Sequence, residues 1–291
     1  MKKTALPTLV LALLLLSACG RPTAAPPSEP PDPPPTPSSL CPDGPPIMPT
    51  PAPGDWTLTR CRIVDGAETG KLILAGEGPN DVYTLNVSDM VVTLDGGSSG
   101  PAELRDGMWV DVGHTGMILE TFPAQFADAR TVGGNTDGLD DRCGLYLQVL
   151  DDLWNADPGL NGDVTELGVD LSGLTDLTES EKSAVAYAFG MAHGSIFPLT
   201  GTFDELADQG YIDKENLYWE DGLFFSIASR EIAWSLPAIA PGGEPPELPT
   251  MTGFDAQKWR SGDGAYYFNN CTAAKSDDGA WTYTVGEQAI S

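Results

Sequence analysis

The sequence predicts an α+β fold in which a small β-barrel precedes a domain with helices packed on an antiparallel sheet. Short runs of β-forming residues, separated by Gly-rich turns, fill residues 55–132. Helical apolar spacing starts at Cys143, and strand patterns follow it up to Ser291. Helices that precede antiparallel strands in one domain favour the α+β class, with the helices on one face of the sheet.

Residues 1–18 have the order of a bacterial export signal. Two lysines precede an apolar run from Ala5 to Ala18, which is shorter than the ~20 residues that span a bilayer. The run ends in Leu16-Ser17-Ala18-Cys19, which resembles the lipobox of bacterial lipoproteins. The resemblance implies cleavage before Cys19 and a lipid on its thiol, so we expect a protein held on the outer face of the cell membrane. An ordinary signal peptide with a chance cysteine is the alternative.

Residues 19–54 are predicted to form a stalk. Fifteen prolines, with Ser, Thr and Ala between them, occur in this stretch, and such a composition favours extended polyproline II and cannot bury a core. Recognition of a PxxP motif by a partner is the alternative to a spacer.

The charge of the chain limits its partners. The sequence has 42 acidic and 15 basic residues, which give a formal charge of −27. Nucleic acid is excluded as a partner because contacts to phosphate require a basic patch. The same charge repels anionic headgroups, so the expected link to the membrane is the lipid alone.

Four cysteines remain beside Cys19, an even number in an exported chain, where disulfides form. We expect the pairs Cys41–Cys61 and Cys143–Cys271, because the first would tie the stalk to the first domain and the second would bracket the other. Four cysteines allow three connectivities, and free thiols also remain open.

The β-rich region ends in two motifs. Arg105-Asp106-Gly107-Met108-Trp109-Val110-Asp111-Val112 precedes Ile118-Leu119-Glu120-Thr121-Phe122-Pro123-Ala124-Gln125. The pair resembles the small OB-like domain of Gram-positive lipoproteins of unknown function, over roughly residues 60–132. This resemblance implies an OB-like β-barrel and a Gram-positive origin, and it supplies no catalytic residues. Closure into a barrel would also remove exposed sheet edges.

Residues 143–291 show three helical patterns and several strands. Leu147, Leu150 and Trp154 share one helix face, and Asp157-Pro158-Gly159 ends that helix. Thr178 and Glu181 form a capping box for a second helix, and a third is expected over 202–209. The strand patterns, with Asp221-Gly222 and Asp278-Gly279 as hairpin signals, fall at 167–171, 217–219, 223–228, 264–273 and 281–285.

Lys258-Trp259-Arg260 is the most unusual motif of this acidic chain. On a strand, the two cations share one face and Trp259 points into the core on the other. Lys258 and Arg260 are therefore candidates for binding a carboxylate of a peptide or wall polymer. Pairing with internal acids is the alternative. The segment from Lys258 to Tyr283 also resembles a C-terminal module of extracellular proteins of clostridia-type bacteria, some of them sensor peptidases of the antibiotic-response kind.

No catalytic constellation is evident. His193 is expected at a helix end, where it would contact the last carbonyls, and His114 in an exposed turn. No cysteine spacing indicates a metal site, the acidic segment 133–142 lacks the spacing of a calcium loop, and no phosphate-binding fingerprint predicts a cofactor.

The functional expectation is a non-enzymatic surface lipoprotein that binds an extracellular protein, peptide or wall polymer. Two alternatives remain. One is an envelope hydrolase that uses a pair of carboxylates or Ser195. The other is a sensing or inhibitory partner in an antibiotic-response system.

Overall fold

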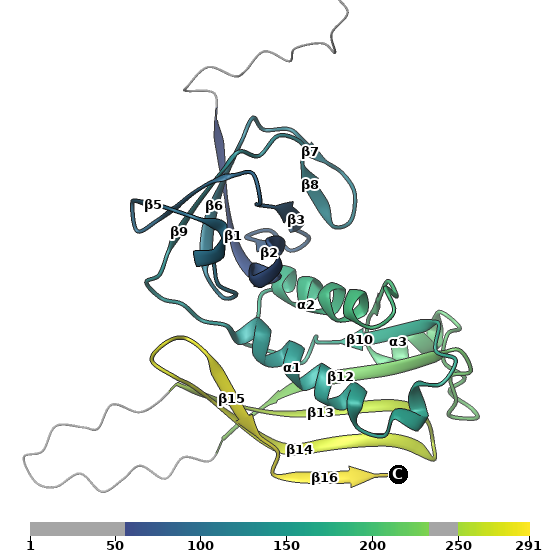
Figure 1. Ribbon diagram of the computed structural model, residues 1–291. Coiled ribbons are helices and arrows are strands. Elements are labelled where there is room, and N and C mark those ends of the chain that lie inside the picture. Colours follow the sequence, from purple (N-terminus) through teal and green to yellow (C-terminus); the bar gives the residue numbers. More distant parts are fainter. Residues whose placement is uncertain (1–55, 233–249) are drawn as a thin grey trace, which may run out of the picture. The chain divides into compact units, whose positions relative to one another are not determined.

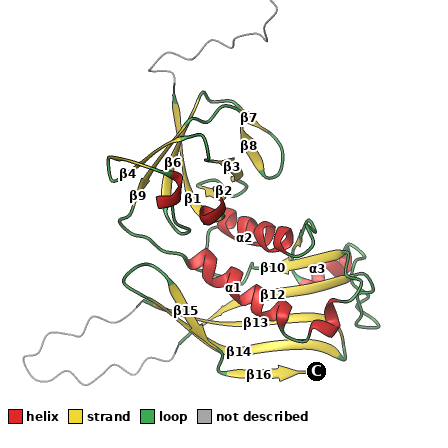
Figure 2. Ribbon diagram, viewed as in Figure 1, coloured by secondary structure: helices red, strands yellow, loops and turns green. Residues whose placement is uncertain are grey.

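The computed structural model describes residues 56–232 and 250–291, which belong to one compact unit (Figures 1 and 2). The export signal, Cys19, the stalk and Cys41 lie outside these residues, and the predictions for them stay predictions. The described residues contain two β-sheets and three α-helices.

The first sheet has nine strands in the spatial order β5-β4-β9-β6-β1-β2-β3-β8-β7. Their bounds are β1 (Thr57–Asp65), β2 (Lys71–Gly76), β3 (Val82–Asn86), β4 (Val91–Leu94), β5 (Gly97–Ser99), β6 (Trp109–His114), β7 (Ile118–Leu119), β8 (Ala124–Phe126) and β9 (Thr131–Asn135). The path is open, so the prediction of a closed barrel is wrong. The end strands β5 and β7 have three and two residues, too few for a closing ladder, and short end strands are another way to limit an exposed edge.

The inner face of this sheet forms a separate apolar core. Strand alternation places Leu72 and Leu74 on that face, together with Val110 and Val112 of β6. All four side chains are buried, as their period-two spacing in the sequence requires.

The second sheet follows the path β11-β10-β12-β13-β14-β15, with β16 also paired to β14. Its strands are β10 (Glu166–Asp170), β11 (Leu199–Thr200), β12 (Gly222–Arg230), β13 (Met251–Ser261), β14 (Gly264–Lys275), β15 (Trp281–Thr284) and β16 (Glu287–Ile290). Strand β10 pairs in parallel with both β11 and β12, so the sheet is mixed and the prediction of a purely antiparallel sheet is wrong. Helical segments between these strands provide the long connections that parallel pairing needs.

The two Asp-Gly signals have different outcomes. Asp278-Gly279 turns β14 into β15, as predicted. Gly222 instead starts a strand that runs parallel to β10, and residues 217–219 form only bridges to Asp213 and Ser261. A Cβ at Gly222 would lie 1.8 Å from the Trp219 ring, so this glycine allows close packing and does not make a hairpin.

The three helices are α1 (Arg142–Asn155), α2 (Glu179–Ala192) and α3 (Phe203–Asp208). All three were predicted, and both termini of α2 match the prediction. Thr178 accepts from the Glu181 amide while the Glu181 carboxylate accepts from the Thr178 amide, which is the expected capping box. Thr202 and Glu205 repeat this arrangement at α3.

Helices cover both faces of the second sheet, which corrects the prediction that they lie on one face. On β13, Phe254 and Ala256 pack in the core that includes α1 and α2. Trp259 points the other way and packs with Leu206 of α3 and with Trp219. Gly168 of β10 leaves room for these two side chains, because a Cβ there would lie 2.8 Å from both.

Helix α2 also packs against the first sheet. Val64, Ala75 and Val82 of that sheet belong to the same apolar cluster as α1 and α2. The Ser180 hydroxyl donates to the Gly76 carbonyl at 2.6 Å. This packing places one side of α2 beside β2 and β3, next to a hollow of about 690 Å³.

Candidate functional site

Lys258 is a structural residue, so its prediction as a ligand-binding group is wrong. Its side chain is fully buried, and its ammonium donates to the carbonyls of Trp154 (3.1 Å), Ala156 (2.5 Å) and Asp157 (3.0 Å). These carbonyls follow or end α1, where a helix leaves its last acceptors without partners. Burial lowers the pKa of Lys258 to about 8, so the amine still carries its proton at neutral pH and uses all three donors.

Arg260 is also committed to the backbone. Its guanidinium donates to the carbonyls of Leu160 (2.8 Å), Gly162 (2.6 Å) and Glu220 (2.8 Å). The two cations thus hold the chain after α1 against β13. The alternative of pairing with internal acids is also wrong, because the acceptors of both side chains are backbone carbonyls. Trp259 is 8% exposed and lies in the core, as predicted.

Neither histidine serves an exposed site. His114 is 1% exposed on β6, which corrects its prediction as an exposed turn residue. The Gly116 amide donates to its Nδ1 at 3.0 Å, so Nε2 carries the proton and donates to Thr59 Oγ1 at 2.8 Å. Burial lowers the pKa of His114, which favours this neutral form.

His193 caps the end of α2, as predicted, but its ring does not contact the last carbonyls of that helix. The ring stacks on Trp154, and Nε2 lies 2.7 Å from Asp151 Oδ1. No hydrogen bond joins Ser195 to His193 within the described chain, so these residues do not form a pair of nucleophile and base.

The cysteines of the described residues are buried thiols. Cys143 and Cys271 are free, and the predicted disulfide between them is not formed. Both side chains belong to the apolar cluster around α1 and α2, and burial raises both thiol pKa values. A thiol in such surroundings behaves as a small apolar residue and is a poor nucleophile. Cys61 is also buried, and its predicted partner Cys41 lies outside the described residues.

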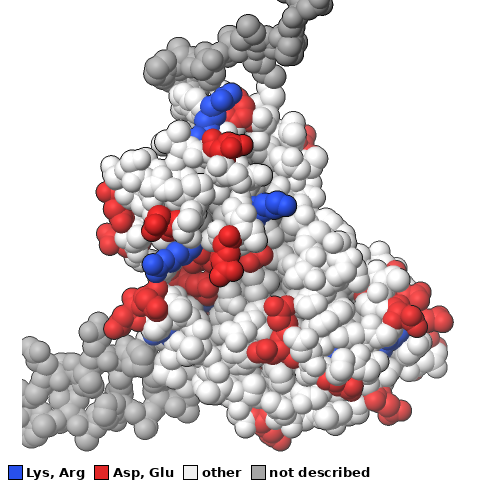
Figure 3. All heavy atoms as spheres, viewed as in Figure 1, with Lys and Arg blue, Asp and Glu red and all other residues white. Residues whose placement is uncertain are grey.

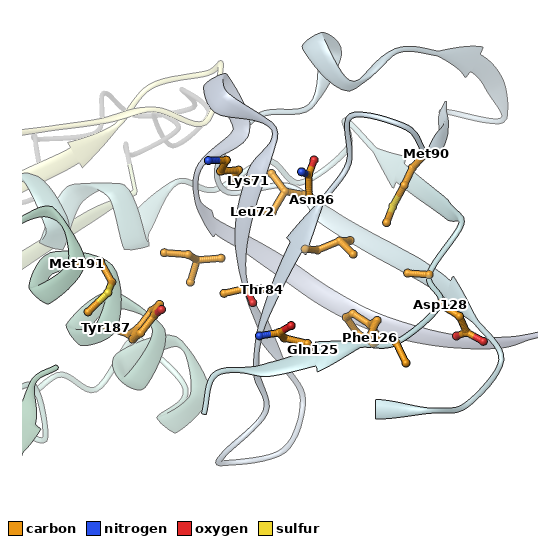
Figure 4. Close-up of a pocket in the computed structure, with 14 residues that line it drawn as sticks. Lys71, Leu72, Thr84, Asn86, Met90, Gln125, Phe126, Asp128, Tyr187 and Met191 are labelled. Carbon is orange, nitrogen blue, oxygen red and sulfur yellow. The ribbon is translucent and has the colours of Figure 1, made fainter. Parts of the chain in front are cut away.

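A pocket of about 690 Å³ opens where β3 and β8 separate (Figure 4). These strands pair in parallel at only two positions, Tyr83 with Ala124 and Thr84 with Gln125. Phe126, the last residue of β8, pairs with Ile118 of β7 and with no residue of β3, and the Ala127 amide donates to the Met117 carbonyl. We call this hollow the β3–β8 pocket.

Apolar walls and a few polar groups line the β3–β8 pocket. Leu72, Leu85 and Phe126 come from the first sheet, while Tyr187 and Met191 come from α2. Its polar side chains are Lys71, Thr84, Asn86, Gln125 and Asp128. A mostly apolar hollow with a few polar groups is typical of small-molecule and peptide sites.

The two charged groups of this lining differ in their hydrogen bonds and ion pairs within the described residues. Asp128 accepts from the amide of Thr115 and from its hydroxyl, so its carboxylate supports a turn. Lys71 is exposed, and within the described residues no carboxylate forms an ion pair with it. In Figure 4 these two side chains lie at opposite parts of the pocket.

Exposed aromatic side chains stand at the rim. Tyr187 of the lining makes edge contacts with Phe122 and Phe197, whose ring centroids lie 6.2 and 6.1 Å away. Phe122 is 48% and Phe197 55% exposed. Large apolar side chains that cluster, exposed to solvent, beside a pocket indicate a binding surface, whereas isolated ones do not.

A second hollow, of about 480 Å³, contains two acids with raised pKa values. Burial and the nearby charge of Asp106 raise the pKa of Asp141 to about 7, and burial raises that of Asp106. Each carboxylate also holds the backbone, since Asp106 accepts from the Ala67 amide and Asp141 caps α1 by accepting from the Gly144 amide. The two acids thus fix loops in addition to lining the hollow.

The surface charge agrees with the composition. On the face shown in Figure 3, acidic side chains outnumber basic ones and are spread over the unit. Lys71, which lines the β3–β8 pocket and has no ion pair among the described residues, is the feature that sequence reasoning missed. The exposed Lys71 at the start of an apolar strand was the available signal, but the divergence of β3 and β8 is not visible in the sequence.

No protein-family model, curated protein or solved structure matches this chain. Within residues 56–232 and 250–291 no helix has the length and apolar character to cross a membrane. The same residues contain no group of three or more His, Cys, Asp or Glu side chains placed to hold a metal ion.

Proposed function

We propose that this chain is a lipoprotein that binds a small ligand outside the cytoplasm and is tethered through a lipid on Cys19. The observation that carries the binding role is the β3–β8 pocket, with apolar walls and a lysine, Lys71, that has no ion pair within the described residues. The lipobox-like Leu16-Ser17-Ala18-Cys19 supports the tether. An outer-face membrane location, and the relationship of the first sheet to OB-like lipoprotein domains, belong to this proposal.

A neutral fluorescent probe tests the pocket. N-phenyl-1-naphthylamine should bind the full chain carrying Cys19→Ser, a form in which no acyl group of its own can enter the pocket. Met191→Trp should fill the α2 side of the pocket and abolish the fluorescence increase. Ala192→Trp is the matched control, because Ala192 is exposed on the same helix and does not line the pocket. Equal probe binding by both variants would place the ligand elsewhere.

Fractionation of cells tests the tether. The unaltered chain should sediment with membranes, and Cys19→Ala should appear in the medium or remain uncleaved. A mutant that stays with the membranes in cleaved form would contradict the lipid anchor.

A hydrolase is the second candidate, because Asp106 and Asp141 line one hollow. Acid–base catalysis needs one protonated and one ionised carboxyl, and the raised pKa of Asp141, about 7, supports the first of these roles. Under this alternative, digestion of purified cell wall should release fragments, and Asp141→Asn should end it. The absence of digestion by the unaltered chain would remove this candidate.

A further inference from the structure

The free edge of β3 in the β3–β8 pocket presents backbone groups as well as side chains. Antiparallel ladders alternate between hydrogen-bonded and non-hydrogen-bonded residue pairs. The Val87 amide donates to the Gly70 carbonyl, so the next pair, Lys71 with Asn86, is of the second kind. The Asn86 amide and carbonyl therefore point away from β2, toward the side that β8 has left.

The position of Asn86 continues an existing ladder. Thr84, two residues earlier on the same edge, pairs in parallel with Gln125. The backbone amide and carbonyl of Asn86 point in the same direction as those of Thr84. They face the pocket because β8 does not extend alongside β3 at this position. A strand placed in the pocket would take the position that β8 leaves vacant.

The side chains around this edge match a peptide better than a simple lipid. The Gln125 side chain offers a donor and an acceptor that would match those of a peptide group. Asn86 Oδ1 accepts from the Ser88 amide and hydroxyl, which leaves its amide nitrogen free to donate. Met191 and Phe126 provide flexible and flat apolar walls for side chains of different shapes.

Charge supplies the remaining element. Lys71 stands opposite Asn86 in the register of β2 and β3, and its ammonium has no ion pair within the described chain. A carboxylate of the ligand could form an ion pair with this ammonium. Asp128, the other charged group of the lining, already accepts from Thr115.

We propose that the β3–β8 pocket binds a short extended peptide that adds a strand to β3 at Asn86 and places a free carboxylate on Lys71. The inference rests on the proposed binding function and names its ligand class. Main-chain hydrogen bonds would provide affinity, and the apolar walls would select side chains, as in other cases of strand addition.

A peptide mixture tests this proposal. The full chain carrying Cys19→Ser is incubated with acetylated random tetrapeptides that have free carboxylates, and the retained peptides are identified by mass spectrometry. The same mixture with amidated C-termini is the first comparison. We expect free acids with apolar side chains to be enriched about tenfold over their amides, as the loss of one charge-assisted hydrogen bond predicts.

Two further comparisons isolate the contacts. Lys71→Gln should lower the enrichment of free acids to that of the amides, whereas Arg130→Gln should leave it unchanged. Arg130 is a suitable control because it is an exposed cation of the same region that does not line the pocket. Peptides methylated on a main-chain nitrogen should bind about tenfold more weakly, because a ladder hydrogen bond is lost without any change in the protein.

The outcomes separate this inference from the proposed function. Binding of N-phenyl-1-naphthylamine without enrichment of any peptide would overturn the peptide ligand and leave the pocket function standing. If neither the probe binds nor any peptide is enriched, both the pocket function and the peptide ligand are overturned. Equal retention of acids and amides would overturn the role of Lys71, and dodecanoate that displaces the peptides at equal concentration would identify an amphiphile as the occupant and overturn the proposal.

Discussion

Two lysines, one on each sheet, show how position decides what a cation does in this acidic chain. Lys258 lies in the middle of β13 under the end of α1, where three carbonyls need donors, and it is fully buried. Lys71 starts β2 beside a gap between strands and remains exposed. The sequence makes the first look functional and the second ordinary, whereas the contacts indicate the reverse.

The difference follows from how the two regions satisfy their polar groups. Around α1, Asp141 caps the first turn and Lys258 the last, so both ends of the helix have charged partners. Around the β3–β8 pocket, Asn86 directs backbone groups to an open side, and Lys71 has no ion pair within the described residues. A region with unused donors and acceptors is the better place to expect a ligand.

Lys258→Met should have the largest effect on stability. The substitution keeps the apolar stem but removes the donors to Trp154, Ala156 and Asp157. We expect the free energy of unfolding in urea to fall by about 3 kcal/mol, because buried acceptors lose their partners. Lys214→Met is the control, since this exposed lysine pairs only with exposed Asp204 and should cost less than ~1 kcal/mol. Equal losses for the two variants would contradict the structural role of Lys258.

Asp141→Asn should stabilise the protein at high pH. The folded-state pKa is raised to about 7, by burial and then by Asp106, so folding favours the protonated carboxyl. The contribution of that carboxyl is therefore fully present below its ordinary pKa of ~4 and is lost as the pH rises through about 7. Asparagine caps a helix about as well as aspartate and does not ionise.

Unfolding in urea at a series of pH values measures this effect. We expect the free energy of unfolding of Asp141→Asn to exceed that of the parent by ~2 kcal/mol at pH ~8 and to equal it near pH ~4. Glu205→Gln is a control on an exposed capping box, where no such gain at high pH is expected. Parallel curves for Asp141→Asn and the parent would contradict the raised pKa.

Arg260→Ala should change the free energy of unfolding less than either substitution at α1 does. The guanidinium joins Leu160, Gly162 and Glu220, but two of these three contacts are exposed to solvent. We expect a loss of about 1 kcal/mol in the free energy of unfolding. Arg260→Lys keeps the charge without the planar fork, so it should recover only part of this loss. Full recovery would show that charge alone matters at this position.

Local patterns predicted the helices well because their signals are local. The capping box at Thr178 and Glu181 lies within four residues, and Gly210 follows α3 with a positive φ of 88°. The α+β class also followed from such signals. The parallel pairing of β10 with β12 could not be read in this way, because it depends on where the chain returns after α2 and α3.

The roles of single residues were harder to predict because their partners are distant in sequence. Lys258 meets carbonyls that lie about a hundred positions earlier, and no spacing rule connects them. The Cys143–Cys271 pair was expected from an even number of cysteines, which carries no information on distance. The β3–β8 pocket exists because the pairing of β3 with β8 ends at Thr84 and Gln125, and this end point depends on tertiary packing.

Lys71→Gln should have the smallest effect on folding and the most specific effect on binding. Lys71 is exposed and has no ion pair within the described residues, so the free energy of unfolding should change by less than ~0.5 kcal/mol. The same variant should lose the preference for peptides with a free carboxylate. A destabilisation similar to that of Lys258→Met would mean that Lys71 is also a structural cation, and the contrast between the two sheets would then fail. Unchanged stability with a lost carboxylate preference is the result that the contrast requires, because a group the fold does not use is free to serve a ligand.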